Sequence, residues 1–382
     1  MKFSLFSILL LALSCSSPTS SEPTQSIKTD TIKNDENRFS ELDKKYNLEK
    51  IRLPHGFKIS VFAEVPGARS LALSPSGVLF IGTRGKKVFA VKDGKLFTIA
   101  DDLNTPNGVA FKDGDLYVAT ISTILKFPAI EKNLATPPQP QTIYNKYPTD
   151  KHHGWKFIAF GPDGKLYVPV GAPCNICESK NPVYASITRI NTDGSGFEIF
   201  AKGIRNTVGF DWDENGNLWF TDNGRDLMGD DVPNDELNEA RTAGLHFGYP
   251  FCHQGNILDP EFGKNKNCSD YVSPKALLGP HVAALGMRFY KGTQFPQTYK
   301  RSIFIAQHGS WNRSQPIGYK VVNVNPYGSD STKVTVFAEG WLQPDNNVLG
   351  RPVDVLETPD GSLLVSDDYA DVVYKITYTG KK

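Results

Sequence analysis

The sequence predicts an all-β fold, a six-bladed β-propeller, because one short phrase recurs along the chain, apolar residues alternate within it, and turn-forming residues separate the copies. Gly and Pro, 33 and 26 of the 382 residues, stand modestly above their usual share, and aromatic residues make 11%. The alternation puts every second side chain on one face of a strand, which suits half-buried sheets.

The recurring phrase consists of an apolar pair, a short turn that ends in Gly, and an alternating strand. Its turn glycines are Gly77, Gly114, Gly164, Gly216 and Gly361, and a degenerate sixth copy runs from Met287 to Ala306. Each copy is expected to be a β-hairpin, since Gly supplies the positive φ that tight turns need. Six such units favour a propeller with one sheet per repeat, and the alternative is a sandwich of unrelated hairpins. Residues 57–63 are expected to add a strand to the last sheet and close the ring.

The first 45 residues are expected to lie outside the propeller. One Lys is followed by an apolar run too short to span a bilayer, and then by Ser14-Cys15. Residues 1–15 are therefore predicted to be a lipoprotein signal peptide ending at the lipobox residue Cys15, and the alternative is an ordinary secretory signal. Residues 16–45 have little apolar surface to bury and are predicted to be a disordered tether, which leaves residues 46–382 for the propeller. The protein is then expected at the cell envelope, lipid-anchored and facing the periplasm or the exterior.

The remaining four cysteines are an even number in an exported chain, which suggests two disulfides. The simplest pairing is Cys174–Cys177 and Cys252–Cys268, and a zinc site built from all four is the alternative. An attached c-type haem is excluded, because Glu178 rather than His follows Cys177.

Charge and motifs exclude several classes of function. Lys plus Arg total 42 and Asp plus Glu total 41, so the net charge of +1 excludes a nucleic-acid reader that acts through a strongly basic surface. The chain has no Gly-x-Gly-x-x-Gly, Walker or Gly-x-Ser-x-Gly motif, so nicotinamide, ATP and serine-hydrolase chemistry have no support.

Basic residues recur at corresponding places just before or just after the phrases. In chain order they are His152, His153, Arg205 (followed by Asn206), His308, Arg313 and Arg351. We expect them to converge on one mouth of the ring as an anion-binding cup, since Arg offers a planar, permanently charged fork for carboxylates. Adjacent histidines on a strand point to opposite faces, so one of the pair is expected to face the centre as a general base. Structural histidines and surface arginines are the alternatives.

An overlong gap at residues 224–285 separates the fourth phrase from the fifth. We expect an insertion on one face of the propeller, with a short helix near Asp235–Thr242. The gap packs four carboxylates into seven residues: Asp230, Asp231, Asp235 and Glu236. Hard oxygen ligands at this density suit Ca²⁺, although the spacing is not that of an EF-hand. The alternative is a solvated acidic loop.

Taken in order from about residue 50 to 378, these motifs resemble the glucose/sorbosone dehydrogenase family, and more narrowly its L-sorbosone dehydrogenase-like branch. The motifs are His-His-Gly-Trp-Lys, Gly-x-Arg-Asn, Asp-Asn-Gly-Arg-Asp with Gly-Asp-Asp and Asp-Glu-Leu-Asn, and the closing Gly-Arg-Pro-Val-Asp-Val. The resemblance implies a six-bladed propeller that binds pyrroloquinoline quinone (PQQ) with Ca²⁺ and oxidises sugars or related polyols.

The resemblance also implies a role for each matching residue. His153 takes the place of the family's catalytic base. The implied cofactor-binding residues are Arg205, Asn206, His308, Arg313 and Arg351. The implied calcium site lies at Asp230, Asp231 and Glu236. The chain departs from the soluble glucose dehydrogenases at His152, Val208 and Val353, where those enzymes have Asp, Gln and a second Arg.

The implied reaction is the oxidation of a sugar, sugar aldehyde or polyol. A proton passes to His153 and a hydride passes to the quinone, which an external cytochrome or quinone then reoxidises. Two alternatives come from other classes: a calcium-dependent lactonase-like propeller hydrolase, and a non-catalytic propeller that binds a ligand at the cell envelope.

Overall fold

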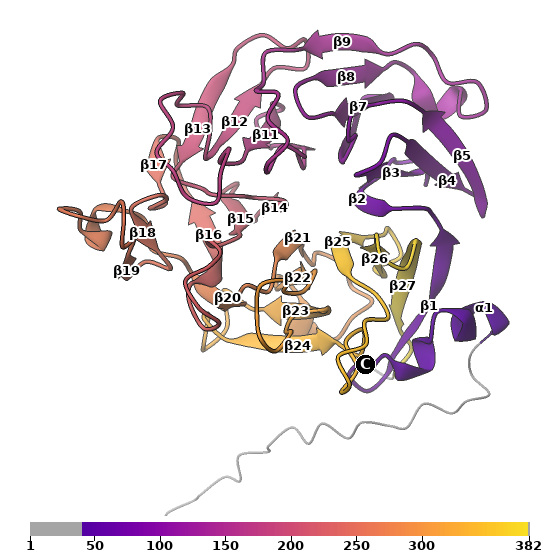
Figure 1. Cartoon of the computed structure of the whole chain (residues 1–382). Helices are drawn as coiled ribbons and strands as arrows, with labels where there is room; N and C mark the ends of the chain where they lie inside the picture. The colour runs from indigo at the N-terminus through magenta and orange to yellow at the C-terminus, as the bar shows by residue number, and fades with distance from the viewer. Residues whose placement is uncertain (1–39, 381–382) are drawn as a thin grey trace, which may run out of the picture. The chain divides into compact units, whose positions relative to one another are not determined.

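The computed structural model describes residues 40–380, and most of them belong to a ring of six β-sheets (Figure 1). The predicted six-bladed propeller is confirmed. Each sheet is one blade, whose strands follow one another from the centre of the ring outward. The predicted signal peptide, Cys15 and residues 16–39 of the predicted tether lie outside the described residues and stay predictions.

Within every blade, neighbouring strands run antiparallel. Blade 1 consists of β2 (Ala68–Leu73), β3 (Leu79–Thr83), β4 (Val88–Lys92) and β5 (Lys95–Ala100). Blade 2 consists of β6 (Gly108–Lys112), β7 (Asp115–Ala119), β8 (Ile124–Phe127) and β9 (Gln141–Tyr144). Blade 3 consists of β10 (Ala159–Phe160), β11 (Leu166–Val170), β12 (Ser186–Ile190) and β13 (Glu198–Lys202). Blade 4 consists of β14 (Phe210–Trp212), β15 (Leu218–Asp222), β16 (Asn234–Ala240) and β20 (Ala276–Pro280). Blade 5 consists of β21 (Ala284–Phe289), β22 (Ile303–Gln307), β23 (Lys320–Val324) and β24 (Val334–Ala338). Blade 6 consists of β25 (Pro352–Glu357), β26 (Leu363–Asp367), β27 (Val372–Tyr378) and β1 (Phe57–Glu64).

The strand predicted at residues 57–63 closes the ring, as expected. It is β1, which pairs with β27 so that Phe57 lies opposite Tyr378 and Glu64 opposite Val372. The Phe57 ring packs edge-on against Phe337 of blade 5, with the ring centroids 5.0 Å apart. Blade 6 therefore joins the first strand of the ring to its last three, and this sheet resists opening of the ring.

The turn glycines do what the recurring phrase predicts. All five have positive φ, from +76° to +89°, and each stands in the turn between the first and second strands of its blade. The degenerate copy is confirmed too, because it supplies the end of β21 and all but the last residue of β22 in blade 5. The second strand of most blades is buried on both faces, because each sheet packs between two neighbouring blades, for example Trp219 of β15 against Phe289 of β21 with the ring centroids 5.8 Å apart.

The few helices are short and lie outside the blades. They are α1 (Glu41–Lys45) and the 3-10 turns η2 (Leu48–Lys50), η3 (Ile130–Lys132), η4 (Cys268–Asp270) and η5 (Gln297–Tyr299). Ser40 caps α1 through a capping box with Asp43. Residues 41–45 of the predicted tether are therefore helical.

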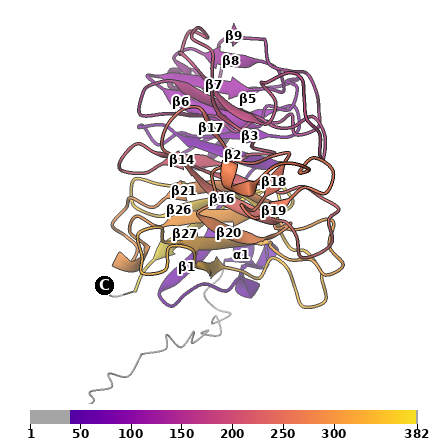
Figure 2. The ribbon, with the colours of Figure 1, turned by 90° about the vertical axis from the view of Figure 1, so that its left-hand side faces the viewer.

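Residues 224–285 contain strands of the blades and, between β16 and β20, an insertion. The helix predicted near Asp235–Thr242 is wrong, because residues 234–240 form β16 between β15 and β20, where both neighbours satisfy its backbone. Between β16 and β20, β17 (Leu245–His246) adds to blade 3. The β18 (Cys252–His253) and β19 (Ile257–Leu258) hairpin lies on the outer edge of the ring (Figures 1 and 2). Both predicted disulfides, Cys174–Cys177 and Cys252–Cys268, are present.

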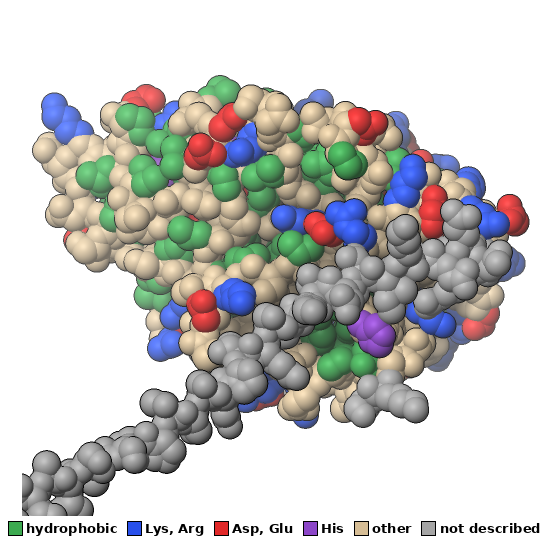
Figure 3. Space-filling view, turned by 90° about the horizontal axis from the view of Figure 1, so that it is seen from below, with side chains coloured by type: hydrophobic (Ala, Val, Ile, Leu, Met, Phe, Trp, Pro, Cys, Tyr) green, Lys and Arg blue, Asp and Glu red, His purple; other side chains and the backbone are tan. Residues whose placement is uncertain are grey.

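The surface seen from below the view of Figure 1 carries side chains of every kind. Outside the grey atoms, hydrophobic groups are scattered among charges of both signs (Figure 3). This mixture agrees with the net charge of +1. Among residues 40–380, no helix has the length and apolar character needed to cross a membrane.

Candidate functional site

Strand direction determines which loops build the site. In a four-stranded antiparallel blade, the loop from the second to the third strand and the connection to the next blade lie on the same face of the ring. That face, here called the cavity face, carries a cavity of about 560 Å³ at the centre of the ring, the central cavity. Its lining comes from these loops and connections, and it includes His152, His153, Arg205, Asn206, His308 and Arg351. The structure thus brings together six of the residues that the sequence singled out.

Two aspartates hold Arg205 and Arg351 in equivalent places. Asp222, the last residue of β15, accepts hydrogen bonds from the backbone N–H of Arg205 (2.9 Å) and of Asn206 (2.7 Å). Asp367, the last residue of β26, accepts from the backbone N–H of Arg351 (2.9 Å). In blades 4 and 6, the last residue of the second strand therefore positions the arginine that precedes the first strand. Burial and the neighbouring Glu236 raise the pKa of Asp222.

The guanidinium groups of these two arginines differ in their partners. Arg205 is 3% exposed and pairs with Asp226 at 2.8 Å. Among residues 40–380, the Arg351 guanidinium donates only to the carbonyl oxygens of His308 (3.0 Å) and Gly309 (2.9 Å), and it lies over the Tyr319 ring. The charge of Arg205 is neutralised by the protein, whereas the charge of Arg351 is left for a ligand.

The two adjacent histidines lie in a turn, so the prediction that they point to opposite faces is wrong. His153 has φ +50°, the two rings are 4.0 Å apart, and both side chains line the central cavity. The Nδ1 atom of His153 donates to the Ala172 carbonyl (2.9 Å), because a carbonyl can only accept. The unprotonated nitrogen is then Nε2. Burial, Arg205 and His152 lower the pKa of His153 well below its usual value, so this imidazole is neutral at pH 7, with a free lone pair on Nε2.

His308 belongs to a charged triad on the cavity wall. Its Nε2 lies 2.7 Å from the Asp368 carboxylate, which also pairs with Arg69 at 2.5 Å. Burial is the main cause that lowers the pKa of His308, to about 4, whereas Asp368 opposes that shift. His308 is therefore a neutral hydrogen-bonding group at pH 7. The positive charge of this triad resides on Arg69 and is balanced by Asp368.

Two further cations of the cavity lack a carboxylate partner among residues 40–380. The Arg84 guanidinium stacks on the Trp155 ring at 4.1 Å, and Lys151 lies beside the histidine turn. Burial and nearby Arg69 lower the pKa of Arg84, and Asp368 opposes this shift. With Arg351, they give the central cavity three uncompensated positive charges.

The floor of the cavity is apolar. Val208 and Val353 pack with Leu285 in one small cluster against Trp155, and Leu285 lines the cavity. These two valines are two of the three positions at which the resemblance described above departs from the soluble glucose dehydrogenases, and the third is His152. The structure thus pairs a cationic wall with a hydrophobic floor, which suits a flat aromatic anion.

The predicted calcium residues do not converge. Asp230 accepts from Ser314, and the Asp230 carbonyl accepts from Arg313. Glu236 is buried on β16, where it accepts from the Gln254 backbone (2.7 Å) and from Asn238 (3.0 Å). Asp231 is exposed, with its nearest cation, Arg313, at 3.5 Å. In the described part of the chain, no three His, Cys, Asp or Glu side chains are grouped to hold a metal ion.

Arg313 therefore faces the acidic loop, and it is absent from the residues that line the central cavity. Its Nε donates to the Gln315 carbonyl (3.2 Å), which keeps the side chain within its own loop. The structure places the other predicted cofactor residues on the cavity wall and Arg313 behind it.

Sequence reasoning missed Arg69, Arg84 and His281 on the cavity wall. The pattern contained a signal for Arg84 and for His281. Arg84 follows the first phrase as His308 follows the fifth, and His281 precedes the fifth phrase as Arg351 precedes the sixth. The Nε2 atom of His281 donates to the Gly229 carbonyl (2.8 Å), which fastens the acidic loop to the cavity wall.

The protein is therefore a six-bladed propeller whose central cavity has a positively charged wall, an apolar floor and a neutral imidazole that is held in place by a hydrogen bond. The family model described as glucose/sorbosone dehydrogenase matches residues 122–373. The chain belongs to the glucose/sorbosone dehydrogenase family.

Relatives by sequence agree with this assignment, and solved structures share the fold. The chain is 32% identical over 345 residues to an uncharacterized protein of Borreliella burgdorferi, a match that covers 86% of this chain and 91% of that protein. It is 27% identical over 232 residues to the pyrroloquinoline quinone-dependent pyranose dehydrogenase of Coprinopsis cinerea, which covers 47% of this chain and 31% of that longer protein. The fold matches the holo PQQ domain of the C. cinerea pyranose dehydrogenase with a TM-score of 0.72 at 20% identity, covering 86% of this chain and 97% of that domain.

Proposed function

We propose that this protein is a PQQ-dependent oxidoreductase that oxidises a sugar, sugar aldehyde or polyol in its central cavity. Family membership and the PQQ domains among its structural relatives support this proposal. The sorbosone-type substrate preference is inferred from the sequence resemblance alone.

The observation that carries the proposal is the charge of the central cavity. Arg84, Lys151 and Arg351 have no carboxylate partner among the described residues, and PQQ is a flat tricarboxylate. Three free cations match three carboxylates, and the apolar floor at Leu285 suits the ring system. Asn206 and His308 complete the wall as neutral hydrogen-bonding groups.

The chain's own contribution to the reaction is placement and proton transfer. When bound, PQQ supplies the two-electron acceptor for the hydride. His153 presents the Nε2 lone pair to the cavity and accepts the substrate hydroxyl proton, while the Ala172 carbonyl holds the Nδ1 proton in place. Burial keeps His153 neutral before the reaction, and Arg205 in the adjacent wall adds to this effect.

Calcium dependence is inferred from the resemblance only. The described acidic residues do not form a ligand set, and no step above is routed through a metal. Equilibrium dialysis against EGTA tests the inference. Loss of PQQ binding that Ca²⁺ restores is expected, and unchanged PQQ binding would overturn it.

The remaining features of the proposal concern the cell envelope. We infer lipid anchoring through Cys15, a periplasmic or exterior location, and reoxidation by an external cytochrome or quinone. Mass spectrometry of the N-terminal peptide of protein extracted from membranes tests the anchor. A diacylglyceryl mass on Cys15 is expected, and an unmodified Cys15 in an otherwise intact chain would overturn it.

The activity is tested with purified protein, PQQ, a redox dye and a panel of sugars and sugar aldehydes. Dye bleaching is expected, with a loss of about 10²-fold or more in His153→Ala and no loss in the control His55→Ala, since general-base catalysis contributes about 10²–10⁴-fold. His55 is an exposed histidine outside the central cavity. Failure to bind PQQ at micromolar concentration, or lactone hydrolysis without PQQ, would overturn the proposal.

A further inference from the structure

A four-residue disulfide loop stands directly behind the cationic wall of the central cavity. It runs from Cys174 to Cys177 in the long loop between β11 and β12, and the two cysteines form one of the two disulfides. The second residue of this loop, Asn175, is half-buried and points at the Arg205–Asp226 ion pair.

Asn175 contacts both members of that pair. Its backbone carbonyl accepts from Arg205 Nε (2.9 Å), and its side-chain Oδ1 accepts from Arg205 Nη2 (2.9 Å). The same Oδ1 accepts from the backbone N–H of Asp226 (2.8 Å), while Nδ2 donates to the Asp226 carbonyl (3.0 Å). One asparagine thus fixes the cation, its counter-ion and the spacing between them.

Four of the N–H donors of the Arg205 guanidinium are used by these neighbours and by Asn223. A guanidinium has five N–H donors. Asn175 takes two of them, Asp226 takes one at Nη2, and the Asn223 carbonyl takes one at Nη1 (3.2 Å). A single N–H on Nη1 remains, on a side chain that lines the central cavity. Its direction is set by the four bonds already made.

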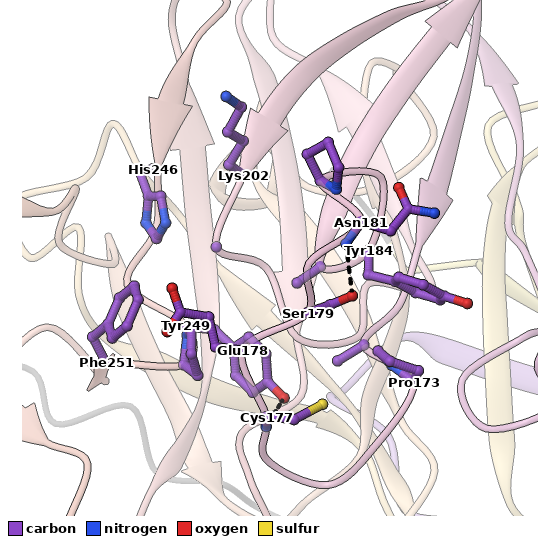
Figure 4. A pocket seen from close by; sticks show the side chains of 15 residues that line it. Pro173, Cys177, Glu178, Ser179, Asn181, Tyr184, Lys202, His246, Tyr249 and Phe251 are labelled. Atoms are coloured by element: carbon purple, nitrogen blue, oxygen red, sulfur yellow. Dashed lines mark hydrogen bonds between the residues drawn. The ribbon is translucent and has the colours of Figure 1, made fainter. Parts of the chain in front are cut away.

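The other side of the loop borders a second, smaller cavity of about 160 Å³, the side cavity, whose lining includes Pro173, Cys177 and Tyr249 (Figure 4). With open space there, packing gives the loop little support on that side. Its shape depends on the disulfide and on the Tyr249 hydroxyl, which accepts from the Cys177 backbone N–H (3.1 Å) as Figure 4 shows.

We infer that Asn175 is a positioning residue for the cofactor wall, and that the Cys174–Cys177 disulfide holds Asn175 in place. The disulfide loop acts through Arg205, whose remaining N–H it aims into the central cavity, and not by touching the ligand. This inference rests on the proposed PQQ function only for its effect on binding, because the geometry at Arg205 exists without the cofactor.

The test uses two variants, Asn175→Ala and the double variant Cys174→Ser/Cys177→Ser, with Asn181→Ala as the matched control. Asn181 lies in the same loop, and its hydrogen-bond partners among the described residues, Ser179, Val183 and Tyr184, lie in that loop too. In the apo protein, the Arg205 Nη2–H resonance is followed, because Asn175→Ala removes the Oδ1 acceptor of Nη2 and keeps the carbonyl that accepts from Nε, and it is assigned by its absence in Arg205→Lys. Its exchange with water is expected to speed up about tenfold or more in both variants and to stay unchanged in Asn181→Ala.

PQQ binding gives the second readout. Its Kd is expected to rise about tenfold in Asn175→Ala, the typical effect of losing a hydrogen bond to a charged group, while the melting temperature stays near that of Asn181→Ala. Absence of PQQ binding in the wild type would overturn the proposed function. The role of Asn175 in positioning Arg205 would then be tested by the hydrogen-exchange measurement alone. An unchanged Arg205 resonance in Asn175→Ala, which keeps the disulfide, would overturn the inference itself.

Discussion

The substitution Gly171→Ala tests the site through a residue that contacts no ligand. Gly171 follows β11 and lies between the backbones of His153 and Arg205. An added Cβ would stand 2.5 Å from the His153 Cβ and 2.9 Å from the His153 carbonyl oxygen. Backbone strain does not contribute, because Gly171 is not among the residues with positive φ.

The size of the effect follows from the distance. Ordinary van der Waals contact begins at 3.4 Å, so the His153 turn must move by about 3.4 − 2.5 = 0.9 Å. A misplacement of about 1 Å in a catalytic group costs on the order of 10²-fold in rate. Overpacking of this kind also destabilises a fold by about 1–3 kcal/mol. We expect kcat/KM to fall about 10²-fold in a protein that remains folded at 25 °C.

The assay is dye-linked oxidation of the best sugar found, with the melting temperature and the Kd of PQQ measured in parallel. Gly85→Ala is the matched control, because it lies in the corresponding loop of blade 1 and its added Cβ would meet nothing closer than 3.6 Å. Activity of Gly171→Ala within twofold of the wild type, in a folded protein, would refute the placement of His153 as the base.

Three further outcomes are expected. Arg351→Gln should raise the Kd of PQQ about 10-fold or more, as seen by fluorescence quenching, because it removes an uncompensated charge; substitution of the exposed Lys58 by Gln (Lys58→Gln) should not, and equal effects would contradict this reasoning. The acid limb of kcat/KM should lie below pH 6.5, since the pKa of His153 is lowered and activity is lost as pH falls through it; a limb centred above 6.5 would count against His153. Phe304→Ala should lower the free energy of unfolding by about 3–5 kcal/mol in urea denaturation, because its ring is fully buried; a cost under 1 kcal/mol would contradict the described core.

The sequence was sufficient for the fold because the fold repeats. Each copy of the phrase carries its own turn glycine and alternation, so an error in one copy is corrected by the others. The strand β16 had no such support. Its sequence, Asn-Asp-Glu-Leu-Asn-Glu-Ala, resembles the first turns of a helix. Its pairing with β15 and β20 makes it a strand.

The site was predicted less completely, because side-chain direction depends on contacts between distant residues. His153 and Arg351 were found from their places beside the phrases. Arg313 has a similar place, yet Asp230, which is distant in sequence, draws it away from the cavity. Arg84 follows the first phrase as His308 follows the fifth, but its unpaired position over Trp155 depends on the fold.

The central claim, that the cavity is a PQQ site with His153 as the base, is tested most directly by a crystal structure of the protein soaked with PQQ. The account predicts a single quinone in the central cavity, with its carboxylates within ion-pair distance of Arg351 and Arg84 and with Nε2 of His153 facing its reactive edge. Quinone density elsewhere, or an empty cavity at a PQQ concentration far above micromolar, would contradict the account.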